Sequence, residues 1–439
     1  MRYPCQSTNR FLLLYCLLGY LLPVICGCAQ GLQIDEIMLN NRAVLADEYG
    51  DYPDWIELFN HGLQPVALEG WSLTDDPAEP GKHLLNGQPA LNPNERRVIW
   101  LEDDFSSSEV NGSGFALKAT GDQIWLFHLG DSLQPRPVDG VTFGRQTPSG
   151  SLIQDAGTRS WHLGIPTPGG PNLSQPMGAV KDLRINEWVA NPDSGADWLE
   201  LSNTGVHPVS LAGIRVQDAL LDDEPFVFEP LSFIGSDSHA YVVLEDGGKQ
   251  PEPDELPFGL SASGESIYLL DEFDNEIDSV VFGSQESGWS YGRPPHSSLK
   301  AERLLSGGSP GRLNWLDSDE DGLGDEWEAL YGFDPFANDP ILSDQDSDGA
   351  TNLEEFLAGT SPIDPTEKLL LHSVSFHDLG ISLGFDAKQG HGYALEISQD
   401  LTHWSMFWEV DLLGADRTVD LTLSMPSSGG PHYFRLISN

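Results

Sequence analysis

The sequence predicts a mainly β protein with two tandem β-sandwiches, a short acidic segment and a small C-terminal β-sandwich. Three observations support this prediction. The chain has 439 residues, which is too long for one ordinary domain. It contains 46 Gly and 31 Pro, and this favours short strands joined by many turns. It also repeats a set of motifs at an offset of 143 residues, which predicts a duplicated domain.

Residues 1–31 have the features of a secretory signal peptide. Arginines at 2 and 10 are followed by an apolar run from 11 to 25 and by the segment GCAQG at 27–31. We therefore expect a protein that is secreted or exposed at the cell surface. Alternatively, ICGC at 25–28 resembles a bacterial lipoprotein box with Cys28 as the lipidated residue. No later apolar run is long enough to span a bilayer. All four cysteines lie in this segment: Cys5, Cys16, Cys26 and Cys28.

The charge balance restricts the partners. The chain has 22 basic and 68 acidic residues, with a net charge of −46. Such a chain repels phosphate backbones, so we expect no nucleic-acid partner. Divalent cations are the natural counter-ions of so many carboxylates. An acidic surface that serves only solubility is the simpler explanation for much of this charge.

The internal repeat defines two of the predicted domains. DWIELFN at 54–60 returns as DWLELSN at 197–203, and LEG at 68–70 returns as LAG at 211–213. Residues 32–173 and 181–315 are therefore predicted to be two copies of one domain, joined by a linker at 174–180. Alternating apolar residues such as those of QIWLF at 123–127 indicate strands with one buried face. Several such strands in a unit of this length favour a β-sandwich.

The order of these motifs resembles the lamin tail domain, an immunoglobulin-like sandwich. The first copy carries IDEI at 34–37, LEGWSLTD at 68–75, GD at 121–122 and TPGGPN at 167–172. The second copy departs from the pattern, with Ile214 in place of Trp71 and GSPG at 308–311 in place of the threonine form. The resemblance implies an accessory module, often found beside secreted hydrolases in bacteria. The nuclear role of animal lamins is not carried over.

The repeated DW motif offers a structural and a functional interpretation. Trp55 and Trp198 alternate with acids along a strand, so we expect both side chains in the cores. A paired-carboxylate site is the alternative for the acids of the motif, which we instead expect to cap turns or face solvent. These acids are Asp54, Glu57, Asp197 and Glu200.

Two twelve-residue stretches predict calcium binding. Both fit the pattern D-x-[DN]-x-[DN]-G-x5-E, which places oxygens at positions 1, 3, 5, 7 and 9 and a closing glutamate at position 12. The predicted ligands of the first loop are Asp317, Asp319, Asp321, the carbonyl of Leu323, Asp325 directly or through water, and Glu328. Those of the second loop are Asp344, Asp346, Asp348, the carbonyl of Ala350, Asn352 and Glu355.

The two loops form one predicted segment, residues 316–365, here called the two-loop segment. From 317 to 355 it has fourteen acidic residues and no basic one, a run that repels itself unless a metal orders it. Short helices are predicted to begin inside the loops and to end at Gly332 and Gly359. Residues 327, 330 and 331 are expected to face residues 353, 356 and 357. The alternative is an acidic linker that matches the pattern by chance.

No helix is predicted before either loop, so the segment resembles dockerin-type or thrombospondin type 3-like calcium repeats more than an EF-hand sensor. Magnesium is a poor fit for so many carboxylates in a flexible loop. Extracellular calcium modules bind at ~10⁻⁴–10⁻³ M, which favours a structural role over signalling.

Residues 366–439 are predicted to form a C-terminal β-domain. Strand patterns occur at 369–376, 381–385, 393–398, 418–423 and 433–437. The segment resembles small β-domains of secreted bacterial proteins and is predicted to be a fibronectin-like or jelly-roll-like sandwich. Surface attachment is one role it could have.

The predicted function is non-catalytic: a calcium-stabilised protein for extracellular or cell-surface adhesion or interaction. The sequence has no H-E-x-x-H, G-x-S-x-G or Walker A motif. The expected partners are calcium ions and an extracellular protein or glycan, with no transmembrane helix after cleavage. Two alternatives stay open. One is an accessory or catalytic part of a calcium-dependent secreted hydrolase. The other is a carbohydrate-binding module that stacks sugars on Trp71, Trp161 or Trp289.

Overall fold

The computed structural model describes most of the chain beyond residue 30. The signal-peptide and lipoprotein predictions, including Cys28, fall on residues 1–30 and therefore lie outside the described residues. Among the described residues, no helix is long and apolar enough to cross a membrane. The described residues are 31–41, 44–47, 52–101, 114–130, 135–148, 150–218, 225–235, 240–247, 255–294, 302–306, 308–311, 314–377, 380–388, 391–410, 416–424 and 432–438.

The first sandwich consists of two antiparallel sheets. The larger sheet has six strands in the order β10 (Leu173–Ser174), β9 (Trp161–Ile165), β8 (Ser151–Gln154), β1 (Leu32–Met38), β2 (Asp54–Asn60) and β5 (Arg96–Leu101). The smaller sheet has four strands in the order β4 (His83–Leu84), β3 (Trp71–Thr74), β6 (Asp122–His128) and β7 (Pro137–Phe143). The apolar faces of the two sheets form one core, which contains Trp71.

The second sandwich has the same arrangement. Its five-stranded sheet has the order β17 (Ala240–Glu245), β12 (Trp198–Asn203), β11 (Leu183–Val189), β20 (Trp289–Gly292) and β21 (Glu302–Ser306). The four-stranded sheet has the order β15 (Phe226–Val227), β14 (Arg215–Gln217), β18 (Ser266–Leu270) and β19 (Glu276–Val281). A turn of 3-10 helix, η1 (Val180–Asp182), precedes β11, and a short pair of strands, β13 (Val209–Ser210) and β16 (Phe233–Ile234), lies beside the sheets.

The two sandwiches share a detail of register as well as strand order. Strands β1 and β2 pair with an irregularity between Ile34 and Glu36, and β11 and β12 pair with the same irregularity between Ile185 and Glu187. A bulge at this place changes which side chains face the closing part of each domain. The shared bulge supports the duplication that the repeated motifs predict.

Most of the tryptophans named above contribute to the hydrophobic cores. Trp55 and Trp71 are fully buried, whereas Trp198 is half-buried, so the core prediction is right for Trp55 and only partly right for Trp198. Trp161 is partly buried and packs against the first core. The guanidinium of Arg303 covers the ring of Trp289 at 4.2 Å. The tryptophans named as sugar platforms are thus buried or covered to a large extent.

Hydrogen bonds and a buried side chain join the two sandwiches. Gly144 N donates to Pro230 O at 2.9 Å, and Gln146 Nε2 donates to Leu231 O at 2.6 Å. Phe233 of the second sandwich is buried in the core of the first. Because a core side chain and peptide hydrogen bonds both cross the boundary, the pair is fixed together rather than loosely tethered.

The two-loop segment contains the two helices of the described residues, α1 (Asp325–Tyr331) and α2 (Asn352–Ala358). Both end at a left-handed glycine, Gly332 with φ 86° and Gly359 with φ 72°, as predicted. Trp327, Leu323 and Phe356 form a small core between the helices. Leu330 is 72% exposed, so its predicted packing is wrong. Its place in the core is taken by Trp315 and Phe333, which flank the helix.

The C-terminal domain is a sandwich of two three-stranded antiparallel sheets. One sheet has the order β22 (Leu371–His377), β23 (Gly380–Ala387) and β26 (Arg417–Ser424), and the other has the order β25 (Ser405–Val410), β24 (Tyr393–Ser398) and β27 (Tyr433–Ser438). Five of these strands overlap predicted ones, and β25 was missed. Its own core includes Phe385 and Tyr393.

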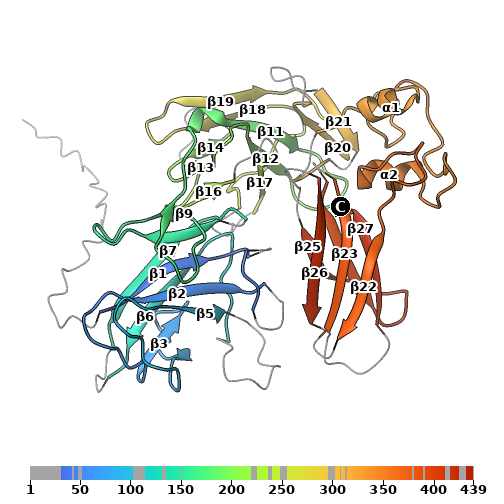
Figure 1. The fold of residues 1–439 in the computed structure, drawn as a ribbon. Helices are drawn as coiled ribbons and strands as arrows, with labels where there is room; N and C mark the ends of the chain where they lie inside the picture. The colour runs from blue at the N-terminus through green and yellow to red at the C-terminus, as the bar shows by residue number, and fades with distance from the viewer. Residues whose placement is uncertain are drawn as a thin grey trace, which may run out of the picture.

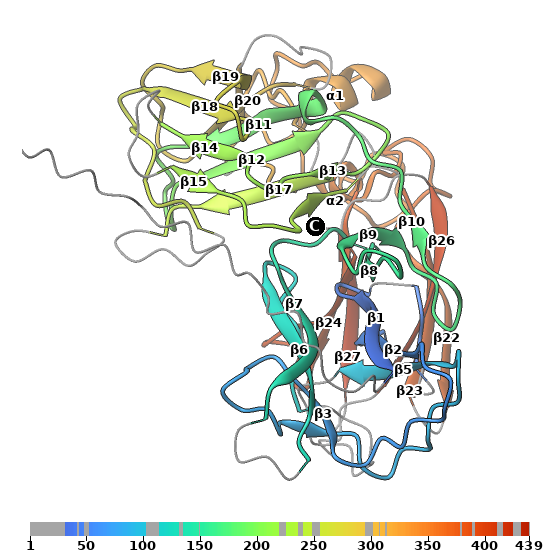
Figure 2. The same cartoon turned by 90° about the vertical axis from the view of Figure 1, so that its left-hand side faces the viewer.

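The parts are arranged as an arch. In Figure 1 the second sandwich lies across the top, and the first sandwich and the C-terminal domain lie below its two ends. The helices α1 and α2 lie at the corner between β20, β21 and the C-terminal domain (Figure 1). Figure 2 shows the first and second sandwiches stacked one below the other. The two-loop segment therefore connects the second sandwich to the C-terminal domain.

Candidate metal centre

The first loop is folded around its own carboxylates. Asp317 Oδ1 accepts from Glu320 N at 2.7 Å, and its Oδ2 accepts from Gly322 N at 3.0 Å. Glu320 and Gly322 both have positive φ, at 66° and 99°, which turns the chain sharply around the first aspartate. As a result, carboxylate oxygens of Asp317, Asp319 and Asp321 lie within 4.8 Å of one another.

The second loop repeats this conformation. Asp344 Oδ1 accepts from Ser347 N at 2.7 Å, and its Oδ2 accepts from Gly349 N at 2.8 Å. Ser347 and Gly349 have φ values of 68° and 99°, close to those of the first loop. Carboxylate oxygens of Asp344, Asp346 and Asp348 also lie within 4.8 Å of one another. The sequence pattern thus places the same three loop positions together twice.

The closing glutamates point inward. Glu328 and Glu355 are fully buried, and none of their carboxylate oxygens has a hydrogen-bond partner within the part of the chain that the structure describes. Burial, together with the neighbouring aspartates, raises the pKa of Glu328 to about 8 and that of Glu355 to about 8. Burial likewise raises the pKa of Asp319, whose two oxygens also lack partners. Buried carboxylates are normally hydrogen-bonded or coordinated, so these groups fit a bound cation.

The predicted ligands at position 9 differ between the loops. Asp325 accepts from Ser318 N at 2.7 Å and from Ser318 Oγ at 2.6 Å, so its carboxylate closes the loop by hydrogen bonds. Asn352 is fully buried, donates to Ser343 Oγ at 3.2 Å and leaves its Oδ1 without a partner. Asn352 therefore has a free oxygen for a ligand, whereas Asp325 is engaged elsewhere.

The residues at position 7 follow the loop geometry. Leu323 N donates to Asp321 Oδ1 at 2.9 Å, and Ala350 N donates to Asp348 Oδ1 at 2.7 Å. The Leu323 side chain is buried in the small core. Each loop thus offers an all-oxygen set of several carboxylates, which suits Ca²⁺ with its 6–8 oxygen ligands. The side chains that would hold it are the three aspartates of each loop with Glu328 or Glu355.

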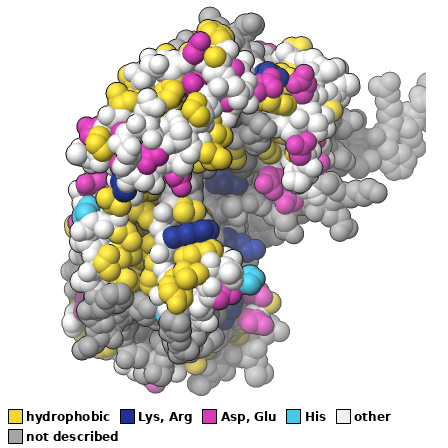
Figure 3. Space-filling view, turned by 90° about the vertical axis from the view of Figure 1, so that its right-hand side faces the viewer, with side chains coloured by type: hydrophobic (Ala, Val, Ile, Leu, Met, Phe, Trp, Pro, Cys, Tyr) yellow, Lys and Arg dark blue, Asp and Glu magenta, His cyan; other side chains and the backbone are white. Residues whose placement is uncertain are grey.

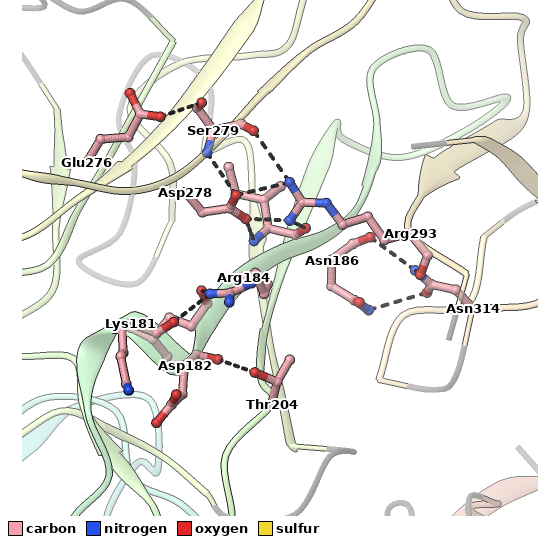
Figure 4. Close-up of polar contacts among 12 residues, drawn as sticks. Lys181, Asp182, Arg184, Asn186, Thr204, Glu276, Asp278, Ser279, Arg293 and Asn314 are labelled. Carbon is pink, nitrogen blue, oxygen red and sulfur yellow. Dashed lines mark hydrogen bonds and ion pairs between the residues drawn. The ribbon is translucent and has the colours of Figure 1, made fainter. Parts of the chain in front are cut away.

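Hydrogen bonds fix the entry to the two-loop segment on the second sandwich. Asn314 Nδ2 donates to Asn186 O at 3.0 Å and to Arg293 O at 2.9 Å, as Figure 4 shows for the pairing of Asn186 with Asn314. Arg293 is itself held by an ion pair with Asp278 (Figure 4). Asn314 lies three residues before Asp317, so the first loop starts from an anchored point. Arg303 of β21 also pairs with Glu320 of the loop at 2.5 Å.

The end of the segment is fixed on the C-terminal domain. Tyr393 Oη donates to Ala358 O at 2.9 Å, and His391 Nδ1 donates to Leu357 O at 2.8 Å. These two side chains satisfy carbonyl groups at the end of α2 that have no partner within the helix. Lys388 pairs with Glu367 at 2.9 Å. Helix α2, which begins in the second loop, therefore ends on the C-terminal domain.

The side of the molecule that carries α1, α2 and the C-terminal domain exposes apolar side chains as well as acidic ones (Figure 3). Phe336 is 78% exposed and Leu342 is 77% exposed, and both belong to the two-loop segment. The segment is thus held together mainly by its loop geometry and by its contacts with the flanking domains, because its own core is small.

Buried glutamates of the second sandwich form a separate carboxylate cluster. Glu187 of β11 and Glu200 of β12 are cross-strand partners and are fully buried. Glu187 accepts from Ser309 N at 3.0 Å, and Glu200 accepts from Asn186 Nδ2 at 2.5 Å and from Gly311 N at 2.5 Å. The pair therefore holds the closing segment of the domain just before the first loop.

The first sandwich has the same carboxylate cluster, and the side chain of Arg96 lies beside it. Glu36 accepts from Thr167 N at 3.0 Å, and Glu57 accepts from Gly169 N. Arg96 Nε lies 3.3 Å from Glu57 Oε1 and 2.8 Å from Asp35 Oδ2. Burial raises the pKa of Glu57 to about 7. In the second sandwich, Asn186 and Tyr241 occupy the register positions of Asp35 and Arg96.

These clusters correct the interpretation of the repeated DW motif. Glu57 and Glu200 were expected to face solvent or cap turns, and that prediction was wrong. They are buried because a closing segment more than 100 residues later covers their face of the sheet. In the strand pairing, each of them lies opposite a glutamate of the neighbouring strand. Asp54 and Asp197 do bind backbone amides as expected, accepting from Asn40 N at 3.0 Å and Leu260 N at 2.8 Å.

The glutamate pair of the second sandwich predicts a pH dependence of stability. Burial raises the pKa of Glu187 from 4.5 to about 7 and raises that of Glu200 well above its ordinary value. The folded state binds the protons of these two carboxyl groups more tightly than the unfolded chain does. Their protonation therefore contributes its full stabilisation of the fold below pH 4.5, and this contribution is lost as the pH rises through about 7. A pKa shift of the size found for Glu187 corresponds to about 3 kcal/mol in the free energy of unfolding.

Urea denaturation at pH 5 and pH 8 checks this prediction. We expect the free energy of unfolding of the second sandwich to fall between the two values. Glu200→Gln keeps the shape of the side chain and removes its charge, so the variant should lose much of this decrease. Parallel pH dependences of the native chain and the variant would contradict the prediction.

One residue of the site was missed by sequence reasoning. Asp339 lies outside both twelve-residue loops, yet its carboxylate falls within 4.8 Å of ligand atoms of Asp321 and Glu328. Asp339 N donates to Asp321 Oδ2 at 2.6 Å. The loop pattern ends at Glu328, so it contains no information on Asp339. The dense acidic run was the only signal that pointed toward it.

Comparison with known families covers part of the chain. Residues 176–284 match the Lamin Tail Domain family. This span runs from the start of the second sandwich through β19, so most of the second sandwich matches this family of immunoglobulin-like β domains. No curated protein and no solved structure matches the chain.

Proposed function

We propose that the chain is a non-catalytic protein of the extracellular space or cell surface, in which two calcium ions stiffen the joint between the second sandwich and the C-terminal domain. The observation that carries the proposal is the pair of buried glutamates, Glu328 and Glu355, whose carboxylates lack a hydrogen-bond partner among the described residues. Glu328 has a ligand atom within 4.8 Å of those of Asp321 and Asp339. Glu355 lies in no such cluster, but the aspartates of the second loop help to raise its pKa. Calcium bound in each loop would give these carboxylates the partner they lack.

The anchoring of the segment supports a structural role for the metal. The first loop begins three residues after Asn314, which is bound to the second sandwich, and the second loop leads into α2, whose end is bound by Tyr393. A change in either loop is therefore transmitted to the orientation of the C-terminal domain. The first sandwich, which has the strand order of the second, is proposed to be a further lamin-tail-like domain.

The role in interaction rests on architecture. The paired carboxylates considered from the sequence all accept from backbone amides, which favours a structural use of them. Glu57 and Glu200 bind the closing segments, and Asp54 and Asp197 bind Asn40 N and Leu260 N. An arch of rigid β-domains presents extended surfaces, and this favours adhesion to an extracellular protein or glycan. The signal-like residues 1–31 support secretion, with lipidation of Cys28 as the alternative mode of attachment.

Limited proteolysis with and without EDTA tests the proposal. We expect calcium to protect residues 316–365 and EDTA to expose them, because the acidic loops repel themselves without a cation. The sandwiches should resist cleavage under both conditions, since none of the clusters of three carboxylates that could hold a metal ion, among the described residues, lies in them. Equal cleavage of the two-loop segment with calcium and with EDTA would contradict the proposed function.

A further inference from the structure

The two loops are not chemically equivalent. In the first loop, Asp339 adds a carboxylate from outside the twelve-residue pattern, and its ligand atom lies within 4.8 Å of those of Asp321 and Glu328. The hydrogen bond from Asp339 N to Asp321 Oδ2, at 2.6 Å, fixes this residue against the loop. Asp339 Oδ2 accepts a long hydrogen bond from Asp334 N, at 3.3 Å.

A second observation indicates that this cluster faces a ligand. Glu328, the middle member, is fully buried, and both its oxygens lack hydrogen-bond partners. Three carboxylates that converge on one point, with one of them buried and unpartnered, have an unfavourable electrostatic energy without a cation.

The second loop has no carboxylate at the position that corresponds to Asp339, and a lysine lies near it. The residue that corresponds to Asp339, 27 positions later, is Thr366. Near it, Lys368 Nζ donates to Asp348 O, beside position 5 of the loop. Lys368 thus places a positive charge against the backbone of the second loop, at its position-5 residue. Such a charge lowers the affinity of the loop for a divalent ion.

We propose that Asp339 is an additional calcium ligand of the first loop and that Lys368 weakens the second loop, so that the two sites fill in sequence. This inference rests on the calcium binding proposed above. Calcium affinity in such loops rises with the number of charged ligands. The first site, next to the second sandwich, then fills at low calcium. The second site, next to the C-terminal domain, fills at higher calcium and completes the joint.

Calorimetric titration of calcium into the full chain tests this proposal. We expect two classes of site that differ in affinity by roughly tenfold or more. Asp339→Asn should weaken the tighter class by roughly tenfold and leave the weaker class unchanged. Lys368→Gln should tighten the weaker class by several-fold and leave the tighter class unchanged.

Glu326→Gln is the matched control, because it removes one negative charge from α1 at an exposed position two residues from Glu328. It should change neither class by more than about twofold, the effect of a screened surface charge. Equal affinities in the native chain, or equal effects of Asp339→Asn and Glu326→Gln, would overturn the inference while leaving calcium binding intact. If the native chain bound no calcium, the proposed function itself would fail. The Lys368→Gln result does not depend on whether Asp339→Asn folds.

Discussion

Replacing both closing glutamates, by Glu328→Gln and Glu355→Gln together, is expected to abolish the calcium-dependent part of the stability. In the native chain, calcium at a hundredfold above its dissociation constant should add about 2.7 kcal/mol per site. The double variant loses the carboxylate that closes each loop, so calcium should add little to its free energy of unfolding. Thermal denaturation at several calcium concentrations measures this difference.

In EDTA, the double variant should not be less stable than the native chain. Without a cation, Glu328 and Glu355 are buried beside other carboxylates and have no hydrogen-bond partner. Glutamine removes the repulsion that these groups cause when ionised, and the proton uptake needed to avoid it, so the double variant should be at least as stable as the native chain in EDTA. Lower stability of the variant under both conditions would mean that the glutamates are structural residues unrelated to a metal.

Gly359→Ala is expected to weaken the junction between α2 and the C-terminal domain. Gly359 has a φ of 72°, and an added Cβ would lie 2.4 Å from Cδ2 of His391. Alanine would pay the cost of the left-handed conformation and would displace the ring whose Nδ1 binds Leu357 O. We expect a loss of about 2–3 kcal/mol, from about 1 kcal/mol of backbone strain and the lost contact.

Gly332→Ala is the matched control within the same chain. Gly332 ends α1 with a φ of 86°, but no atom of the described residues lies within 4 Å of its added Cβ. This variant should lose only the backbone cost, about 1 kcal/mol. Denaturation of both variants in saturating calcium compares them directly. Equal losses at the two glycines would contradict the role of His391 at the junction.

Local chemistry made much of the two-loop segment predictable. The aspartates and glycines of each loop dictate the turn, and the C-terminal glycines dictate where the helices end, because only glycine adopts a left-handed conformation at low cost. The repeated motifs likewise predicted a duplicated sandwich, and the match of residues 176–284 to the lamin tail domain bears out the resemblance for the second copy.

Features that depend on distant parts of the chain were not predictable. Glu57 and Glu200 have the pattern of exposed strand residues, and only the closing segments more than 100 residues later bury them. Asp339 joins the first loop through a tertiary contact that no spacing rule contains. Strand β25, with the sequence SMFWEV, was missed because its apolar residues do not alternate strictly, and a bulge disrupts its pairing.

The orientation of the C-terminal domain is the most direct test of a calcium-stiffened joint. Spin labels on Val281→Cys and Val374→Cys, both at exposed positions on different domains, would report the distance between the second sandwich and the C-terminal domain. All four native cysteines precede residue 30, so they can be replaced by serine without touching the described structure. We predict one narrow distance distribution with calcium and a broad one in EDTA. The same narrow distribution under both conditions would contradict the account.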